Sequence, residues 1–370
     1  MVNDVSEFKR ILEEIRWLDA HLQGKDFLLT RERSLKEVQQ VLYTAEALKW
    51  LWENNISAKC FDSGLAILQI KDRPGLEPFS WSGRHRLSFG FAANSLGLTV
   101  HQMDKDEGEI QADYFSFLKE TEFIGIHDTY PGEEGDRKGS KDKAGNTKMK
   151  ELAAEMDSWG ASGNGTGTGD IIRRPGIINL QCDLDHPIQA MADILVLKHH
   201  FGSIERLVGK KIAVIWVNSP GAAVPFPVPQ GFIGLVTRFN TEVILAHPGG
   251  YDLNPLVLEA ARTNAETGDR HFTVTHSMDT ALTDADALYM MNWPASTVPG
   301  EKIAVDEWTY SEEKIKLTRE GKAFLMDSKP AMGWQSYIIA AMMLNNRFKE
   351  SAKLLGSLRK RNIKRLLFSF

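Results

Sequence analysis

The chain of 370 residues is poor in cysteine and has no long apolar run. Its two cysteines, Cys60 and Cys182, cannot form the disulfide framework of a small secreted domain, so we expect a reducing compartment. No apolar stretch is long enough to cross a bilayer, and the acidic, helical N-terminus predicts no signal peptide. The sequence therefore predicts a cytoplasmic protein with no membrane partner.

The chain also lacks an excess of basic charge and a nucleotide-binding glycine pattern. Its formal net charge of −5 at pH 7 predicts no nucleic-acid partner. The basic stretch 359–365 is typical of a solvated helix C-terminus. No Gly-x-Gly-x-x-Gly follows the apolar segment that ends at Val217, and no strand precedes the glycine-rich stretch 163–169, which favours a loop. We therefore expect no dinucleotide, no other cofactor and no metal site.

The apolar pattern predicts an α/β protein. Hydrophobic residues make up 42% of the chain and charged residues 25%, and the length is enough for two domains, each with its own core. Alternating strand and helix patterns indicate parallel sheets covered by helices, with ligands at the carboxyl ends of the strands. A capping box, Ser34-Leu-Lys-Glu37, opens the second helix. Predicted helices are 5–22, 34–51, from about 87, 149–156, 187–202, 231–239, 254–265 and from about 335; predicted strands are 66–70, 123–127, 177–180, 211–217, 241–246, 272–275, 287–291 and 324–327.

The stretch from Ile178 to Gly202 joins the two halves and has the strongest signs of a ligand site. It begins as a buried strand, turns at an acidic corner, and enters a helix with Pro187 near its first position. His186 and Gln189 then share one face of the first turn, beside backbone N–H groups that can hold a polar or anionic ligand. The alternative is that a histidine before proline only caps the helix.

A second polar cluster lies about a hundred residues earlier. Ser82, Arg84 and Arg86 place a hydroxyl and two guanidinium groups within five residues, between a predicted strand and a helix from about Leu87. Arginine forks match phosphate oxygens, and a helix N-terminus adds partial positive charge. The cluster therefore predicts a phosphate site.

Ser-x-Arg-x-Arg followed by Ser-Phe, with His-Pro-x-Gln much later, resembles the aspartate/ornithine carbamoyltransferase family. The resemblance covers nearly the whole chain and is strongest to the knotted carbamoyltransferases of the YgeW type, on segments such as 179–183, 189–193, 228–231 and 250–252. It implies two doubly wound parallel-sheet domains joined by interdomain helices, a backbone knot at the proline-rich loop after Val217, and a homotrimer with sites between subunits. The implied divisions are a carbamoyl-phosphate-binding domain at 1–185 with a C-terminal helix 335–358 returning to it, an interdomain helix at 186–202, and an acceptor-binding Rossmann-like domain at 203–334.

The same resemblance implies an enzyme that transfers a carbamoyl group from carbamoyl phosphate to the amine of an amino-acid or ureido acceptor. Such an enzyme works by positioning its substrates and stabilising an oxyanion, without a covalent nucleophile. The residues implied as catalytic are His186, Gln189 and Arg84. Those implied in carbamoyl-phosphate binding are Ser82, Gly83, Arg84, His85, Arg86, His127, His186 and Gln189, and those implied in acceptor binding are Trp293, Asp327, Ser328 and Lys329.

Several positions depart from the family pattern. Gly83 and His85 stand where the family has threonines, and His127 stands where it has an arginine. The loop that normally reaches the neighbouring subunit is reduced to an acidic stretch at 104–109, and 327–330 replaces the usual acceptor loop. These departures leave an alternative open, a catalytically impaired paralogue that serves as a ligand-binding or partner subunit.

Overall fold

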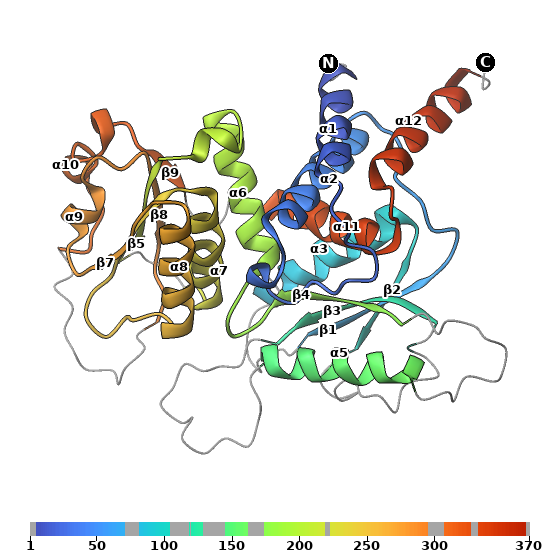
Figure 1. Ribbon diagram of the computed structural model, residues 1–370, viewed down its shortest axis with the longest axis horizontal. Coiled ribbons are helices and arrows are strands. Elements are labelled where there is room, and N and C mark those ends of the chain that lie inside the picture. Colours follow the sequence, from blue (N-terminus) through green and yellow to red (C-terminus); the bar gives the residue numbers. More distant parts are fainter. Residues whose placement is uncertain are drawn as a thin grey trace. The chain divides into compact units, whose positions relative to one another are not determined.

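The computed structural model describes residues 5–70, 81–103, 118, 120–128, 145–161, 174–218, 223–294, 307–326 and 332–367. These residues form two compact units, each with its own parallel sheet (Figure 1). Of the described residues, those through Cys182 and those from Gly333 onward form unit 1, and those from Asp183 to Met332 form unit 2. Among the described residues, no helix combines the length and the apolarity that a membrane span requires.

The sheet of unit 1 has four parallel strands in the order β2-β1-β3-β4. Its central strand β3 is buried along most of its length, as expected for a strand covered on both faces. Figure 1 shows α5 along one face of this sheet, with α3, α2 and α11 on the other. The strands are β1 (Leu65–Ile70), β2 (Thr99–Met103), β3 (Thr121–His127) and β4 (Gly176–Gln181); the helices are α1 (Val5–Leu18), α2 (Leu35–Glu53), α3 (Trp81–Leu96), α5 (Gly145–Ala161), α11 (Met332–Arg347) and α12 (Ser351–Leu367).

The sheet of unit 2 has five parallel strands in the order β7-β6-β5-β8-β9. Helix α6 packs on α7, and α7 packs on α8. The strands are β5 (Lys211–Trp216), β6 (Glu242–Ala246), β7 (Phe272–Thr275), β8 (Ala287–Met291) and β9 (Phe324–Met326); the helices are α6 (Pro187–Phe201), α7 (Pro227–Val236), α8 (Pro255–Thr267), α9 (Met278–Leu282) and α10 (Glu312–Ile315). The predicted α/β class with two parallel-sheet domains is confirmed.

The predicted secondary structure needs correction at three places. Helix α3 begins at Trp81 and not near Leu87, so the Arg84 and Arg86 positions lie in its first two turns and not in a preceding loop. The C-terminal helix is two helices, because the chain leaves helical structure between Arg347 and Ser351. Strand β2 was not predicted; it is an edge strand that pairs with β1 only.

The strand orders fix where each unit is expected to hold a ligand. In unit 1 the chain continues from β1 to one side of the sheet and from β3 to the other, so these neighbouring strands form a topological switch point. In unit 2 the same holds for β5 and β8. Ligands of open α/β sheets bind outside the carboxyl ends of such strands.

Candidate active site

In unit 1 the switch point carries two histidines from different elements. His127 is the last residue of β3, and His85 lies in the first turns of α3, the helix that follows β1. Both side chains are buried, and their ring centroids are 4.6 Å apart. The structure thus brings together two predicted carbamoyl-phosphate residues that lie 42 positions apart in the sequence.

Helix α3 can reach this position because of a glycine in the strand beneath it. A Cβ atom on Gly125 of β3 would lie 2.4 Å from the ring of Phe89, which is fully buried. The absence of a side chain at position 125 therefore lets α3 approach the sheet closely. Arg84 and Arg86 are partly exposed in the same turns, and the Arg84 carbonyl accepts a hydrogen bond from the Ser88 hydroxyl at 2.7 Å.

Ser82 is the remaining hydroxyl of the predicted phosphate cluster. Its backbone belongs to the first turn of α3, but its side chain is outside the described residues. Gly83 follows it in the same turn. The cluster is therefore presented by a helix N-terminus, where N–H groups without intrahelical partners favour an anion.

Gln181 is a buried polar residue at this edge that the sequence did not single out. It ends β4, where it lies in register with His127, and its carbonyl accepts from the Asp128 N–H at 3.0 Å. Its side chain is fully buried, and within the described part of the chain neither its amide nitrogen nor its amide oxygen has a hydrogen-bond partner. Each such group costs about 1–3 kcal/mol if it stays unsatisfied, so this edge of unit 1 is suited to a polar ligand.

In unit 2 the polar groups gather at the start of α6. His186 is the N-cap residue and Pro187 occupies the first helical position, as predicted. The His186 side chain is fully buried and makes no capping hydrogen bond, so capping does not explain a histidine at this position. The helix ends as predicted at Gly202, which has a φ of 95° and donates its N–H to the Lys198 carbonyl at 2.8 Å.

The Gln189 side chain is held by Asp193 of the same helix, which is in turn bonded to a residue of the sheet. Its Nε2 donates to Oδ1 of Asp193 at 2.9 Å, one turn further along α6. The other carboxylate oxygen of Asp193 accepts a hydrogen bond from the hydroxyl of Tyr289, in β8, at 2.5 Å. All three side chains are at most 1% exposed.

Helix α7 positions the acidic corner that precedes His186. The Gln230 side chain donates to the Asp183 carbonyl at 3.1 Å and accepts from the Asn254 N–H at 3.0 Å. A Cβ atom on Gly231 would lie 2.6 Å from Oδ1 of Asp185 and 3.0 Å from the backbone nitrogen of His186. The Val-Pro-Gln-Gly segment at 228–231 therefore has a structural role, because it lets α7 pack closely against the acidic corner that precedes His186.

The switch point of unit 2 contains a buried tryptophan cluster. Trp293, a predicted acceptor residue, follows β8 and is 1% exposed. Its indole N–H donates to the Tyr251 carbonyl at 2.9 Å, while its own carbonyl accepts from the Trp216 indole at 2.9 Å. Both the ring and the backbone of Trp293 are thus fixed.

His247 lies beside this cluster, at the carboxyl end of β6, and was not assigned a role from the sequence. Its Nδ1 is 2.8 Å from the Pro248 carbonyl, so Nδ1 carries the proton in the neutral ring. Burial lowers the pKa of His247 below its ordinary value, although the Pro248 carbonyl and the charge of Asp252 act in the opposite direction. The neutral imidazole is therefore favoured, with Nε2 as an acceptor.

The remaining predicted residues are not brought into either group. Asp327, Ser328 and Lys329 lie outside the described residues, as does the loop 104–109. Arg84, Arg86 and His127 belong to unit 1, whereas His186 and Gln189 belong to unit 2. No cluster of three or more histidine, cysteine, aspartate or glutamate side chains suited to a metal ion occurs in the part of the chain that the structure covers.

The chain is similar along almost its whole length to a protein named as a putative carbamoyltransferase, and over a shorter stretch to other carbamoyltransferases. It is 37% identical to the Escherichia coli K12 protein named "Putative carbamoyltransferase YgeW", over 97% of this chain and 98% of that protein. It is 32% identical to N-acetylornithine carbamoyltransferase of Xylella fastidiosa strain Temecula1, over 38% of this chain and 44% of the relative. No protein-family model matches the sequence.

Solved structures share the fold. An N-acetyl-L-ornithine transcarbamylase mutant, crystallised with carbamyl phosphate and N-succinyl-L-norvaline, superposes with a TM-score of 0.64 at 20% identity, over 86% of this chain and 98% of that one. A second structure of N-acetyl-L-ornithine transcarbamylase gives a TM-score of 0.63. With identity this low, the match concerns the fold. The full-length sequence relationship is what identifies the chain, which belongs to the carbamoyltransferase family.

Proposed function

We propose that this protein transfers a carbamoyl group from carbamoyl phosphate to the amine of an amino-acid or ureido acceptor. The observation that carries the proposal is the 37% identity over 97% of the chain to a protein named as a carbamoyltransferase. Two features of the chain support it: a basic helix start at one switch point, and a buried His-Pro-x-Gln helix start that is not explained as a cap.

In this proposal the start of α3 binds the phosphate. Arg84 and Arg86 supply charge-assisted hydrogen bonds, Ser82 supplies a hydroxyl, and Gly83 leaves the backbone N–H groups accessible. His85 and His127 complete the anion side, and His127 takes the place of the arginine of the family pattern. A histidine attracts an anion by charge only while it is protonated, so we expect phosphate binding to weaken as pH rises.

His186 and Gln189 then act on the carbamoyl group. His186 donates a hydrogen bond to the oxygen that becomes an oxyanion when the amine attacks, and Gln189 binds the carbamoyl amide. Removing one donor of this kind typically lowers turnover by about 10²–10³. The amine forms the new C–N bond and loses one proton, and inorganic phosphate leaves with the electrons of the C–O bond that breaks and takes up that proton.

The acceptor half of the proposal rests on fewer described residues. Trp293 forms a rigid wall at the switch point of unit 2, and Asp327, Ser328 and Lys329 are assigned to the acceptor through the resemblance alone. The proposal also includes a homotrimer, a backbone knot at the proline-rich loop after Val217, a cytoplasmic location, and the division into 1–185, 186–202 and 203–334 with 335–358 returning to the first domain.

Calorimetry with carbamoyl phosphate, and with inorganic phosphate as its control, tests the proposal at pH 6 and pH 8. We expect preferential binding of carbamoyl phosphate, stronger at pH 6, and loss of binding in Arg86→Ala. Arg262→Ala is the matched control, because Arg262 is a half-exposed arginine on α8 whose partner is Glu259. An acceptor screen then measures phosphate release. Absence of binding at both pH values, in a folded protein, would refute the proposal and favour a catalytically impaired paralogue.

A further inference from the structure

The buried pair of Asp193 and Tyr289 has no role in the proposed chemistry, yet it contacts a residue that does. Asp193 lies in α6 and Tyr289 in β8, and both side chains are fully buried. One carboxylate oxygen accepts from Gln189 and the other from Tyr289. The carboxylate therefore connects the amide of Gln189 to the sheet.

This connection fixes which way the Gln189 amide faces. A glutamine side chain has a donor end and an acceptor end of nearly the same shape, so packing alone discriminates poorly between its two orientations. Here Nε2 faces a carboxylate oxygen. The reverse orientation would place the amide oxygen against an oxygen that only accepts when ionised, with no hydrogen between them.

Tyr289 in turn fixes the carboxylate. Its ring packs against that of Phe232, in α7, with a centroid distance of 4.1 Å, so the hydroxyl cannot swing away from Asp193. The hydrogen bond from a β-strand holds the second oxygen of a side chain on α6. Rotation of the Asp193 carboxylate would break this bond and the bond to Gln189 together.

We propose that Asp193 and Tyr289 are positioning residues that hold the Gln189 amide with its nitrogen on the Asp193 carboxylate, so that its oxygen is the end that accepts from an N–H group of the carbamoyl donor. This inference rests on the proposed function and adds a specificity determinant to it. The recognised chemistry is a primary amide N–H, which carbamoyl phosphate has and inorganic phosphate lacks. A purely structural role for the pair would instead affect both ligands equally.

Calorimetry on Asp193→Asn and Tyr289→Phe separates these possibilities. Asparagine keeps the shape but presents both a donor and an acceptor to Gln189, and phenylalanine keeps the ring but removes the hydroxyl. We expect about tenfold weaker binding of carbamoyl phosphate in Asp193→Asn and a smaller loss in Tyr289→Phe, with phosphate binding unchanged, as suits one hydrogen bond to a charged group. Thr241→Val is the control, since it removes a different buried hydrogen bond of unit 2, to the Val236 carbonyl.

A double-mutant cycle asks whether Asp193 acts through Gln189. If it does, Asp193→Asn has no further effect on carbamoyl-phosphate binding in a Gln189→Ala background. Additive losses, or equal losses for carbamoyl phosphate and phosphate in a variant as stable as the control, would overturn the proposal.

An NMR measurement decides the positioning role even if the protein binds no carbamoyl phosphate. In ¹⁵N-glutamine-labelled protein, we expect the Gln189 side-chain N–H pair, assigned by Gln189→Leu, to exchange slowly with solvent. In Asp193→Asn the pair should broaden or exchange faster, while Gln230, which bonds to two backbone groups, stays unchanged. Identical Gln189 signals in both proteins would overturn the positioning role, whereas failure of wild-type binding alone would refute only the proposed function.

Discussion

At the residue scale, substitution by alanine is expected to have opposite effects on stability at two glycines that lie three positions apart on α7. Gly231 has no room for a Cβ atom, because Asp185 and the His186 backbone occupy the space. Gly234 has no atom within 4 Å of where its Cβ would lie. We expect Gly231→Ala to destabilise the protein by about 1–3 kcal/mol, since the acidic corner must move.

Gly234→Ala is the matched control for that change. Alanine is favoured over glycine inside a helix, so this variant should be stabilised by about 0.5–1 kcal/mol. Urea unfolding gives both free energies, and carbamoyl-phosphate calorimetry shows whether the shift reaches His186. Equal stability of the two variants would contradict the prediction, because it would mean that the acidic corner adjusts to the added methyl group without a loss of stability.

His247 makes the stability of the protein depend on pH. Its pKa is lowered in the fold, so between the unfolded value of 6.5 and the folded value the unfolded chain binds a proton that the native protein does not. Stability is therefore lost as pH falls below 6.5. His247→Asn retains a donor for the Pro248 carbonyl but does not titrate, so its stability should decline less between pH 8 and pH 5.5.

Urea unfolding over this pH range tests the His247 prediction. The difference in free energy of unfolding between the wild-type protein and His247→Asn should change by up to about 1.4 kcal/mol per pH unit. His276, whose ring centroid is 5.1 Å from that of His247, contributes to lowering the pKa of His247 and needs its own variant, His276→Asn. Parallel stability curves for the wild-type protein and His247→Asn would contradict the prediction.

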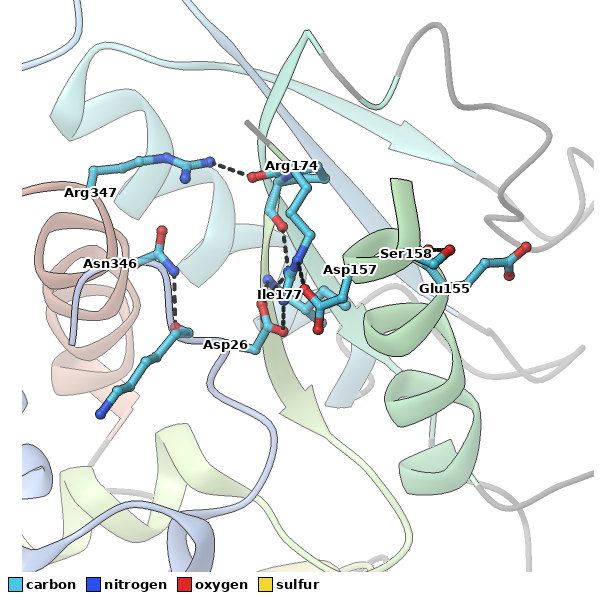
Figure 2. Close-up of polar contacts among 10 residues, drawn as sticks. Asp26, Glu155, Asp157, Ser158, Arg174, Ile177, Asn346 and Arg347 are labelled. Carbon is cyan, nitrogen blue, oxygen red and sulfur yellow. Dashed lines mark hydrogen bonds and ion pairs between the residues drawn. The ribbon is translucent and has the colours of Figure 1, made fainter. Parts of the chain in front are cut away.

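At the scale of elements, a buried ion pair holds the N-terminal segment to the start of β4. The Asp26 carboxylate accepts two hydrogen bonds from the Arg174 guanidinium, at 2.9 and 2.8 Å, and one from the Ile177 N–H at 2.8 Å (Figure 2). Burial acts to lower the pKa of Arg174, but Asp26 and Asp157 outweigh it and raise the pKa above its ordinary value. Arg174 also pairs with Asp157 of α5 at 2.6 Å, so the two ion pairs together connect three segments of unit 1.

Removing this carboxylate should be more costly than neutralising it. Asp26→Ala leaves the buried Ile177 N–H and the guanidinium without this acceptor, for an expected loss of about 3–5 kcal/mol. Asp26→Asn keeps an oxygen for Ile177, so about 1–3 kcal/mol is expected. Asp157→Ala should cost less than about 1 kcal/mol, because Asp157 is largely exposed. Thermal unfolding measures all three, and equal losses for alanine and asparagine would contradict the argument.

Local signals predicted most elements, and distant contacts account for the rest. The capping box at Ser34 is present as predicted, because both of its hydrogen bonds join residues three positions apart. The start of α3 was missed because Ser82, Gly83 and His85 have lower helix propensities than most residues. Strand β2 was missed because, as an edge strand, it is mostly exposed and lacks a clear apolar alternation.

The same division applies to the candidate site. His186 and Gln189 could be proposed from the sequence because they are neighbours on one helix turn, and the Arg84 cluster because it is contiguous. The ring contact of His85 with His127 and the bond of Asp193 to Tyr289 join residues 42 and 96 positions apart, and no local pattern encodes them. Gln181 was overlooked because its distinguishing property, a buried amide with no hydrogen-bond partner among the described residues, exists only in the folded state.

At the scale of the whole molecule, unit 1 is built from two distant parts of the chain. The C-terminal helices return to it: the Asn345 amide bonds to both Gln40 and Thr44 of α2, and Arg347 forms an ion pair with Glu122 of β3. Four large apolar side chains of α11 are completely buried, and their burial together contributes about 6–12 kcal/mol. The side chains are Ile338, Ile339, Met343 and Leu344.

A chain that ends at residue 332 should therefore lose the fold of unit 1, because the burial by α11 alone is comparable to the usual net stability of a domain, about 5–15 kcal/mol. The described residues of unit 2 form one sequence stretch with its own sheet, so they should stay folded. Hydrogen exchange with mass spectrometry tests this: peptides from β1 and β3 should lose protection while those from β5 and β8 keep it. A milder control, Asn345→Ala, should lower the protection of β1 and β3 without abolishing it. If β1 and β3 remained protected in the truncated chain, the N-terminal part would fold without its C-terminal helices.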